Sequence, residues 1–158
     1  IDAEYSYRGE NTSKAYNNIT NPENETGSWS AKSNSLMVNL SVNLLEKSAI
    51  MPYFRTGLGI SQNKPSDYIA TVVTSGITTN NTYTGKRTNE FAYQIGAGVV
   101  MNTSSVFDTQ LEYMYVNRGK IKTDTDYINS TTGLLLDSSA RTGYLKDHVI
   151  TIGIRYKF

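Results

Sequence analysis

The single histidine, His148, is the one candidate general base that ordinary acid–base chemistry near neutral pH offers in this sequence. A hydrolytic pair would need a serine on the same face of an extended chain, two residues away, and Ile150 stands there. Asp147 is adjacent to the histidine and would point to the opposite face of a strand. We therefore expect no enzymatic activity and no catalytic residue.

Metal, thiol and nucleic-acid chemistry are excluded by residue type and charge. The 158 residues include no cysteine and one histidine, which rules out disulfide scaffolds, thiol catalysis and multi-histidine metal sites. Fifteen Lys and Arg residues oppose 14 Asp and Glu residues, so a net charge of +1 provides no basic field for nucleic acid. We expect no cofactor, no metal and no nucleic-acid partner.

The remaining residues that could take part in chemistry are charged side chains, which occupy alternate positions of extended segments. Such charges could line an ion path or a ligand site, or they could neutralise one another as ion pairs in a narrow lumen. The interior of an eight-stranded barrel is just wide enough for side chains to fill, which favours the ion pairs. The candidate lumen charges are Asp2, Glu4, Arg8, Arg55, Glu90, Asp108, Glu112, Arg155 and Lys157.

Six segments position these charges, and each alternates polar and apolar residues with period two. They span residues 1–8, 35–45, 53–61, 90–101, 107–117 and 149–158. Each segment is close in length to a tilted transmembrane strand, which needs roughly 9–11 residues. Their apolar faces carry aromatic residues, which form girdles at the lipid head groups in a membrane barrel. These are Tyr5, Tyr7, Phe54, Phe91, Tyr93, Phe107, Tyr113, Tyr115, Tyr156 and Phe158.

Short and long connections alternate between the six segments. Residues 46–52 and 102–106 are short links, whereas 9–34, 62–89 and 118–147 are long and rich in Asn, Thr, Ser and Gly. This order is typical of an all-β, antiparallel, up-and-down transmembrane barrel, because compact soluble domains seldom carry three such loops. Residues 68–74 and 77–84 are expected to extend the flanking strands as a hairpin. A soluble β-sandwich, with the same apolar faces packed inside, remains the alternative.

The last eight residues read polar, any, Gly, any, any, aromatic, any, aromatic: Thr151, Gly153, Tyr156 and Phe158 fill the specified positions. This motif resembles the C-terminal signal by which the assembly machinery recognises outer-membrane barrels. The chain is similar to opacity-type, outer-membrane protein A-like eight-stranded barrels, and in texture to the small surface barrels and adhesins of rickettsia-like bacteria. "PYFRTGLGIS", "NEFAYQIGAGVV" and "HVITIGIRYKF" look like the fifth, sixth and eighth strands of that family.

The resemblance implies eight strands, of which six are visible, and residues 1–8 look like the third. We therefore expect residues 1–158 to be a single outer-membrane barrel domain that lacks its first β-hairpin, since lipid does not tolerate unpaired edges. The alternative is that the hairpin within 62–89 supplies the other two spanning strands. That arrangement would place Thr- and Asn-rich segments in lipid.

The resemblance also implies a protein of the bacterial outer membrane, with its loops at the cell surface and with membrane lipid and the barrel-assembly machinery as partners. Function is then expected in the loops, as adhesion, binding of host surface proteins or support of the envelope. A small porin-like channel is the alternative, followed by a lipid A-modifying enzyme. Exposed aromatic, basic and apolar residues are the candidate binding residues. They are Tyr16, Trp29, Lys86, Arg87, Tyr127, Leu135 and Tyr144.

Overall fold

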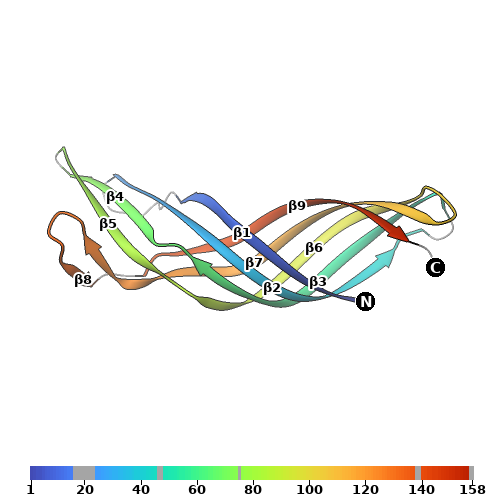
Figure 1. Ribbon diagram of the computed structural model, residues 1–158, viewed down its shortest axis with the longest axis horizontal. Helices are drawn as coiled ribbons and strands as arrows, with labels where there is room; N and C mark the ends of the chain where they lie inside the picture. The colour runs from blue at the N-terminus through green and yellow to red at the C-terminus, as the bar shows by residue number, and fades with distance from the viewer. Residues whose placement is uncertain (16–23, 46–47, 75, 138–139, 157–158) are drawn as a thin grey trace.

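The computed structural model describes residues 1–15, 24–45, 48–74, 76–137 and 140–156, with the backbone alone for 10–15, 24–29, 74, 137 and 155. The described residues form nine β-strands (Figure 1). They are β1 (Asp2–Ala15), β2 (Asn24–Asn43), β3 (Ile50–Pro65), β4 (Tyr68–Thr74), β5 (Ile77–Lys86), β6 (Thr88–Asn102), β7 (Phe107–Asn129), β8 (Leu135–Asp137) and β9 (Thr142–Tyr156). In this part of the chain no helix has the length and apolarity that a membrane crossing requires.

Six of these strands lie side by side in the sheet in the same order as in the sequence. β1 pairs with β2, β2 with β3, β3 with β6, β6 with β7 and β7 with β9, always antiparallel. In its described residues, each of the six alternating segments lies wholly or largely in one of these strands. The predicted all-β, up-and-down order is therefore confirmed.

The three shorter strands prolong the long ones in the same sheet. β4 continues the line of β3 along β2, because Ala31 pairs with Pro65 and Ser28 with Ile69. β5 continues β6 along β7 in the same way, and β4 pairs with β5. The expected hairpin extension is confirmed, and its strands are not two additional spanning strands. We call the end with β4, β5 and β8 the extension end, and the end with the links 44–49 and 103–106 the turn end (Figure 1).

The prediction of long loops at residues 9–34 and 118–147 is wrong for much of their length. β1 continues to Ala15 and β2 begins at Asn24, while β7 continues to Asn129 and β9 begins at Thr142. The Thr residues that suggested loops also suit a solvated strand. Pairing of the two arms satisfies backbone groups that a free loop would leave to water.

The apolar face of the sheet points outward and the polar face points inward. Leu36 and Ile60, which are directly paired, are 53% and 66% exposed, whereas Ser61, next in the chain, is 1% exposed. The outward apolar side chains extend from Ile50 to Ile60 on β3, which at a rise of about 3.3 Å and a tilt of about 40° gives a band about 25 Å tall. We call this band the apolar belt. A soluble sandwich would bury the same side chains.

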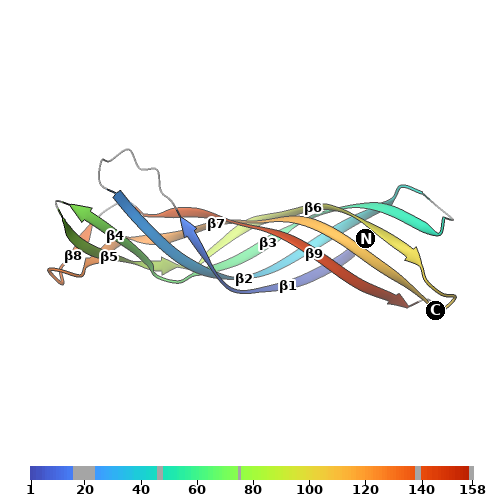
Figure 2. The ribbon, with the colours of Figure 1, turned by 90° about the horizontal axis from the view of Figure 1, so that it is seen from above.

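The sheet is curled, so its two outermost strands face one another across the polar interior (Figure 2). Arg8 on β1 binds Asp147 on β9 at 2.8 Å. Within the described residues no backbone pairing joins these two strands, and we call the space between them the seam. The expected additional hairpin would pair with both edges, and it stays a prediction.

Candidate functional site

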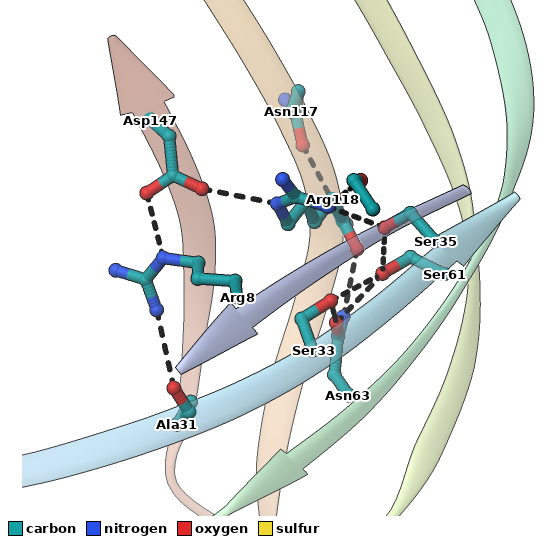
Figure 3. Close-up of polar contacts among 11 residues, drawn as sticks. Arg8, Ala31, Ser33, Ser35, Ser61, Asn63, Asn117, Arg118 and Asp147 are labelled. Atoms are coloured by element: carbon teal, nitrogen blue, oxygen red, sulfur yellow. Dashed lines mark hydrogen bonds and ion pairs between the residues drawn. The ribbon is translucent and has the colours of Figure 1, made fainter. Parts of the chain in front are cut away.

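Asp147 binds two arginines inside the curled sheet (Figure 3). Its Oδ1 accepts a hydrogen bond from Arg8 Nε at 2.8 Å, and its Oδ2 accepts one from Arg118 Nε at 3.0 Å. The side chains of Asp147, Arg8 and Arg118 are 16%, 12% and 7% exposed. Charges so far removed from water need close partners, and this geometry supplies them.

Arg118 also connects β7 to a buried cluster of hydroxyl and amide groups (Figure 3). Its Nη1 donates to Ser35 Oγ at 2.6 Å and to Ser6 Oγ at 3.1 Å. Asn63 Nδ2 donates to the Arg118 carbonyl at 2.7 Å, and Asn63 Oδ1 accepts from Ser33 Oγ at 2.7 Å. The cluster fixes the guanidinium from several strands at once, so its position is determined by the sheet rather than by a flexible side chain.

A second charged cluster surrounds Arg55, nearer the turn end. Arg55 Nη2 lies 2.7 Å from Asp2 Oδ2 and 3.1 Å from Glu4 Oε2, and Nη1 lies 3.6 Å from Glu112 Oε2. Tyr53 donates its hydroxyl to the same Glu112 oxygen at 2.6 Å. This level combines one arginine with three carboxylates, whereas the Asp147 level combines two arginines with one carboxylate. The interior therefore holds opposite excess charges at two heights.

Apolar side chains fill the interior on the extension side of these clusters. The members come from β2, β4, β5, β7 and β9 and are at most 4% exposed: Ala31, Tyr68, Ala70, Tyr83, Ile121 and Leu145. The rings of Tyr68 and Tyr83 lie 5.9 Å apart, and the Arg141 guanidinium lies 5.1 Å from the Tyr83 ring. We call this cluster the interior plug. The sequence predicted ion pairs in the lumen, and the structure adds this apolar packing on their extension side.

A cavity of about 390 Å³ lies beside the seam. Both charged clusters contribute to its lining, with Glu4, Glu112, Arg8, Arg118 and Asp147 among the lining residues. The interior is thus packed on the side of β2, β3 and β6 and open beside the two unpaired edges.

His148 takes no part in the ion pairs described above, although it borders the same cavity from the outward face of β9. Its Nδ1 is 2.6 Å from the Tyr113 hydroxyl, and its ring centroid is 5.4 Å from that of Tyr115. Asp147 turns inward to the arginines and does not orient the imidazole. Among the described residues, no three His, Asp or Glu side chains gather in a way that could hold a metal ion.

Four outward positions beyond the belt form a continuous row across the extension end. Ile69 pairs with Thr82, Thr82 with Ile128, and Ile128 with Leu135. Ile69, Ile128 and Leu135 are 49%, 50% and 66% exposed. We call Ile69, Ile128 and Leu135 the apolar row.

Comparison with known families decides the class of the protein. The family described as "Outer membrane protein beta-barrel domain" matches residues 1–158. The chain belongs to this family. No curated protein and no solved structure matches it. The protein is accordingly an integral protein of the bacterial outer membrane.

The predicted lumen charges lie at several depths inside the outer-membrane barrel. Asp2, Glu4, Arg8, Arg55 and Glu112 belong to the two clusters above. Asp108 is buried near the turn end and Glu90 is half-buried. The side chain of Arg155 and all of Lys157 lie outside the described residues.

Sequence reasoning missed Arg118 and Asp147, the centre of the interior network of this barrel. Both had been assigned to a long loop. A signal was present, because Glu112, Met114, Val116 and Arg118 continue one period-two series, and Asp147 precedes Val149 and Thr151 in another.

The candidate binding residues of the barrel divide into three groups. Lys86, Arg87, Leu135 and Tyr144 are exposed at the extension end. Tyr127 is half-buried, and its ring stacks on Tyr83 at 5.0 Å. Tyr16 and the Trp29 side chain lie outside the described residues.

The C-terminal motif occupies the edge strand of the barrel. Thr151, Gly153 and Tyr156 belong to β9, with the Tyr156 side chain 59% exposed. Phe158 lies outside the described residues. Recognition by the assembly machinery stays a prediction from the motif.

Proposed function

We propose that the protein is a non-conducting surface barrel that attaches the bacterium to another protein, such as one on a host cell, through its extension end. Outer-membrane barrels have short periplasmic turns and longer extracellular segments. The turn end has two short links, whereas the extension end has paired strands that continue far beyond the belt. We infer that the extension end is extracellular.

The apolar row carries this proposal. Its three side chains lie beyond the membrane belt, on the outward face, where water rather than lipid would surround them. A contiguous apolar surface rimmed by polar residues is the usual mark of a protein-binding site. Thr82 lies between Ile69 and Ile128, and Lys86 and Arg87 lie at the level below the row. Apolar anchors and cations are therefore available together.

Packing beneath the row supports a rigid binding surface. Ile69 stands between Tyr68 and Ala70 of the interior plug, which are 1% and 0% exposed. A surface fixed from beneath loses little conformational entropy on binding, which favours affinity.

The packing of the barrel interior favours a role in attachment over a role in ion conduction. Arg55 and Arg118 are held by ion pairs and hydrogen bonds, and the plug closes the interior toward the extension end. We also propose that the barrel has no enzymatic activity, since the Tyr113 hydroxyl is the partner of His148 and Asp147 is held by arginines.

The test displays the complete protein on a non-adherent laboratory bacterium and counts bacteria attached to cultured epithelial cells. Leu135→Asp and Ile128→Asp each place a charge in the apolar row, and we expect each to reduce attachment about tenfold or more, as for a central anchor. Thr131→Asp is the matched control, because Thr131 is exposed at the same end but lies outside the row.

A variant that still folds should show the same gel mobility as the wild type when neither sample is boiled. Attachment no greater than that of bacteria lacking the protein would reject adhesion to these cells and favour a role within the envelope. Equal attachment by the Leu135→Asp and Thr131→Asp variants would reject the apolar row as the binding surface.

A further inference from the structure

A groove crosses the outer face of four neighbouring strands at the border of the apolar belt, on the side of the extension end. Its volume is about 520 Å³, and residues of β1, β2, β3 and β6 line it. An aromatic ring stands at each side, with two aliphatic side chains between the rings. In the order of the strands, these directly paired residues are Tyr5, Leu36, Ile60 and Phe91.

A row of side-chain amides follows these apolar residues in the direction of the extension end. Asn34 pairs with Gln62, and Gln62 with Asn89, so three adjacent strands place an amide at one height. Each amide is two residues from the apolar residue of its strand, which is about 5 Å along the membrane normal at a rise of about 3.3 Å and a tilt of about 40°. We call Asn34, Gln62 and Asn89 the amide row. It stands at the interface, where the acyl chains of a lipid join the head group.

The amide row keeps hydrogen-bonding groups of both kinds available. Tyr5 donates its hydroxyl to Asn34 Oδ1 at 3.2 Å, and Gln62 Nε2 donates to Asn89 Oδ1 at 3.3 Å. Within the described residues, Asn34 Nδ2, Gln62 Oε1 and Asn89 Nδ2 have no partner. The row therefore offers two donors with an acceptor between them. A ligand that satisfies it needs acceptors and at least one donor of its own.

The lining of the groove favours an uncharged head group. Among the described residues that line it there is no lysine or arginine, and the charged group is the half-buried Glu90 carboxylate. A phosphate inside the groove would face that carboxylate without a cation. A sugar attached directly to the acyl chains or to their glycerol brings several hydroxyls, and each of them donates and accepts. Phosphatidylcholine brings acceptors alone.

The opposite border of the belt has a different composition on the same strands. The last pair of β3 with β6 there is Ile50 with Met101, and Leu44 follows the end of β2. Apolar side chains thus continue to the turn end, where an amide row stands at the other border. A lipid recognised by the amide row belongs to the leaflet at the extension end.

We propose that the groove binds a glycolipid of this leaflet, with an acyl chain between Tyr5 and Phe91 and the sugar hydroxyls on the amide row. Hydrogen bonds rather than charge select the lipid. A phospholipid without donors would cover Gln62 Oε1 and leave it unpaired, which costs free energy that a sugar hydroxyl avoids. This surface is separate from the apolar row, so the proposal does not depend on attachment to another cell.

The experiment uses the complete folded protein with one reporter tryptophan in the groove. Trp29→Phe removes the one tryptophan of the sequence, and Phe91→Trp introduces another while keeping a ring at the wall. The protein is reconstituted in phosphatidylcholine with increasing fractions of a brominated lipid, which quenches the tryptophan when it occupies the neighbouring site. We expect brominated monoglucosyl diacylglycerol to bind at the reporter at least fivefold more strongly than brominated phosphatidylcholine, the effect of one net hydrogen bond or more.

A second reporter tests whether this preference belongs to the groove. Phe107→Trp in the Trp29→Phe background places the tryptophan on the outer face at the turn end, away from the amide row. Both lipids should bind equally there. The same preference at the two reporters would show general enrichment of the glycolipid around the barrel and would reject the groove as its site.

Removing one amide tests the role of the row. Gln62→Met keeps the length of the side chain, and we expect it to lower the preference at the groove reporter about fivefold by removing one hydrogen bond. An unchanged preference in this variant, folded as judged by gel mobility without boiling, would overturn the proposal. Asn34→Leu on β2 repeats the test if Gln62→Met does not fold.

Other brominated phospholipids distinguish a sugar from other donors and from charge. Phosphatidylethanolamine carries an ammonium donor, and phosphatidylglycerol combines hydroxyls with a negative charge. Both should bind at the groove reporter more weakly than the glucosyl lipid. Stronger binding of either one would reject a sugar head group, and equal binding of the glucosyl lipid and phosphatidylcholine would reject selective binding altogether.

Discussion

Asp147 neutralises the charge of two arginines, one from its neighbouring strand and one from across the seam. Arg8 reaches it from β1 and Arg118 from β7, while Asp147 itself is on β9 (Figure 3). Without this carboxylate, two largely buried guanidinium groups would face each other across the cavity beside the seam. A buried charge left without its partner is among the larger costs that one substitution can cause.

Asp147→Ala should therefore lower the free energy of unfolding by about 3 kcal/mol, and Asp147→Asn by less, because the amide still accepts one hydrogen bond. Urea unfolding of the folded protein in detergent, followed by gel mobility without boiling, measures the change. Asp124→Ala is the control, because its ion pair with Lys86 is exposed and contributes at most about 1 kcal/mol. Equal losses for the two alanine variants would show that Asp147 is no more important than a surface charge.

Bulges interrupt the strands at one height, just beyond the apolar belt. The register shifts between Arg8 and Asn11 on β1 and between Asn117 and Lys120 on β7. On β7 the series Glu112, Met114, Val116 and Arg118 points inward, and after the bulge Ile121 and Thr123 are the inward residues. The β7 bulge thus exchanges odd and even positions between the two faces. This change allows Arg118 and Ile121, an odd number of residues apart, to face the same interior.

Gly119 makes the β7 bulge possible, because its φ is +83°. Gly119→Ala introduces a side chain at that angle and against the Glu90 side chain, so we expect a loss of stability of about 1–2 kcal/mol. Gly9→Ala, in the β1 bulge, is the control: a Cβ there would meet no atom within 4 Å. Urea midpoints of the two variants should differ, and a Gly119→Ala midpoint equal to that of the wild type would reject a conformational requirement for glycine.

The whole barrel is asymmetric along its axis. Charged clusters occupy the middle and the turn side of the interior, and the plug occupies the extension side. Outside, the apolar belt is followed in the same direction by a level of exposed lysines that includes Lys32, Lys64 and Lys86, and then by the apolar row. On β7, interior and exterior residues change together because its bulge exchanges the two faces just beyond the belt.

This arrangement predicts that the complete protein does not conduct ions. In planar bilayers we expect no reproducible conductance steps, because ions would have to pass both a bonded charge network and the interior plug. Leu135→Asp should behave in the same way, since it changes only the outer face. Discrete steps in the wild type that Arg55→Ala alters would support the porin-like alternative instead.

The amino-acid sequence alone predicted the strands of the belt and favoured a membrane barrel over a soluble β-sandwich. Residues 35–45 and 53–61 alternate small polar and large apolar side chains. In a strand that crosses a membrane, the apolar side chains then face lipid and the polar side chains face the barrel interior. Mixed charges on the polar face likewise predicted ion pairs, and Arg55 with Glu4 is one of them. These features depend on residues that are close together in the sequence, so a local pattern of residue types is enough to predict them.

Tertiary structure decided what lies beyond the belt. A bulge adds a residue to one strand only, so its effect on the faces depends on the partner strand and is not visible in the period-two pattern of either. For this reason Tyr127 was expected on the surface but packs on Tyr83. Arg118 continues the period-two series before the bulge, but its pairing with Asp147 on a neighbouring strand is a tertiary feature. Lys32 and Lys64 are 32 residues apart in the chain, and only their register makes them opposed charges.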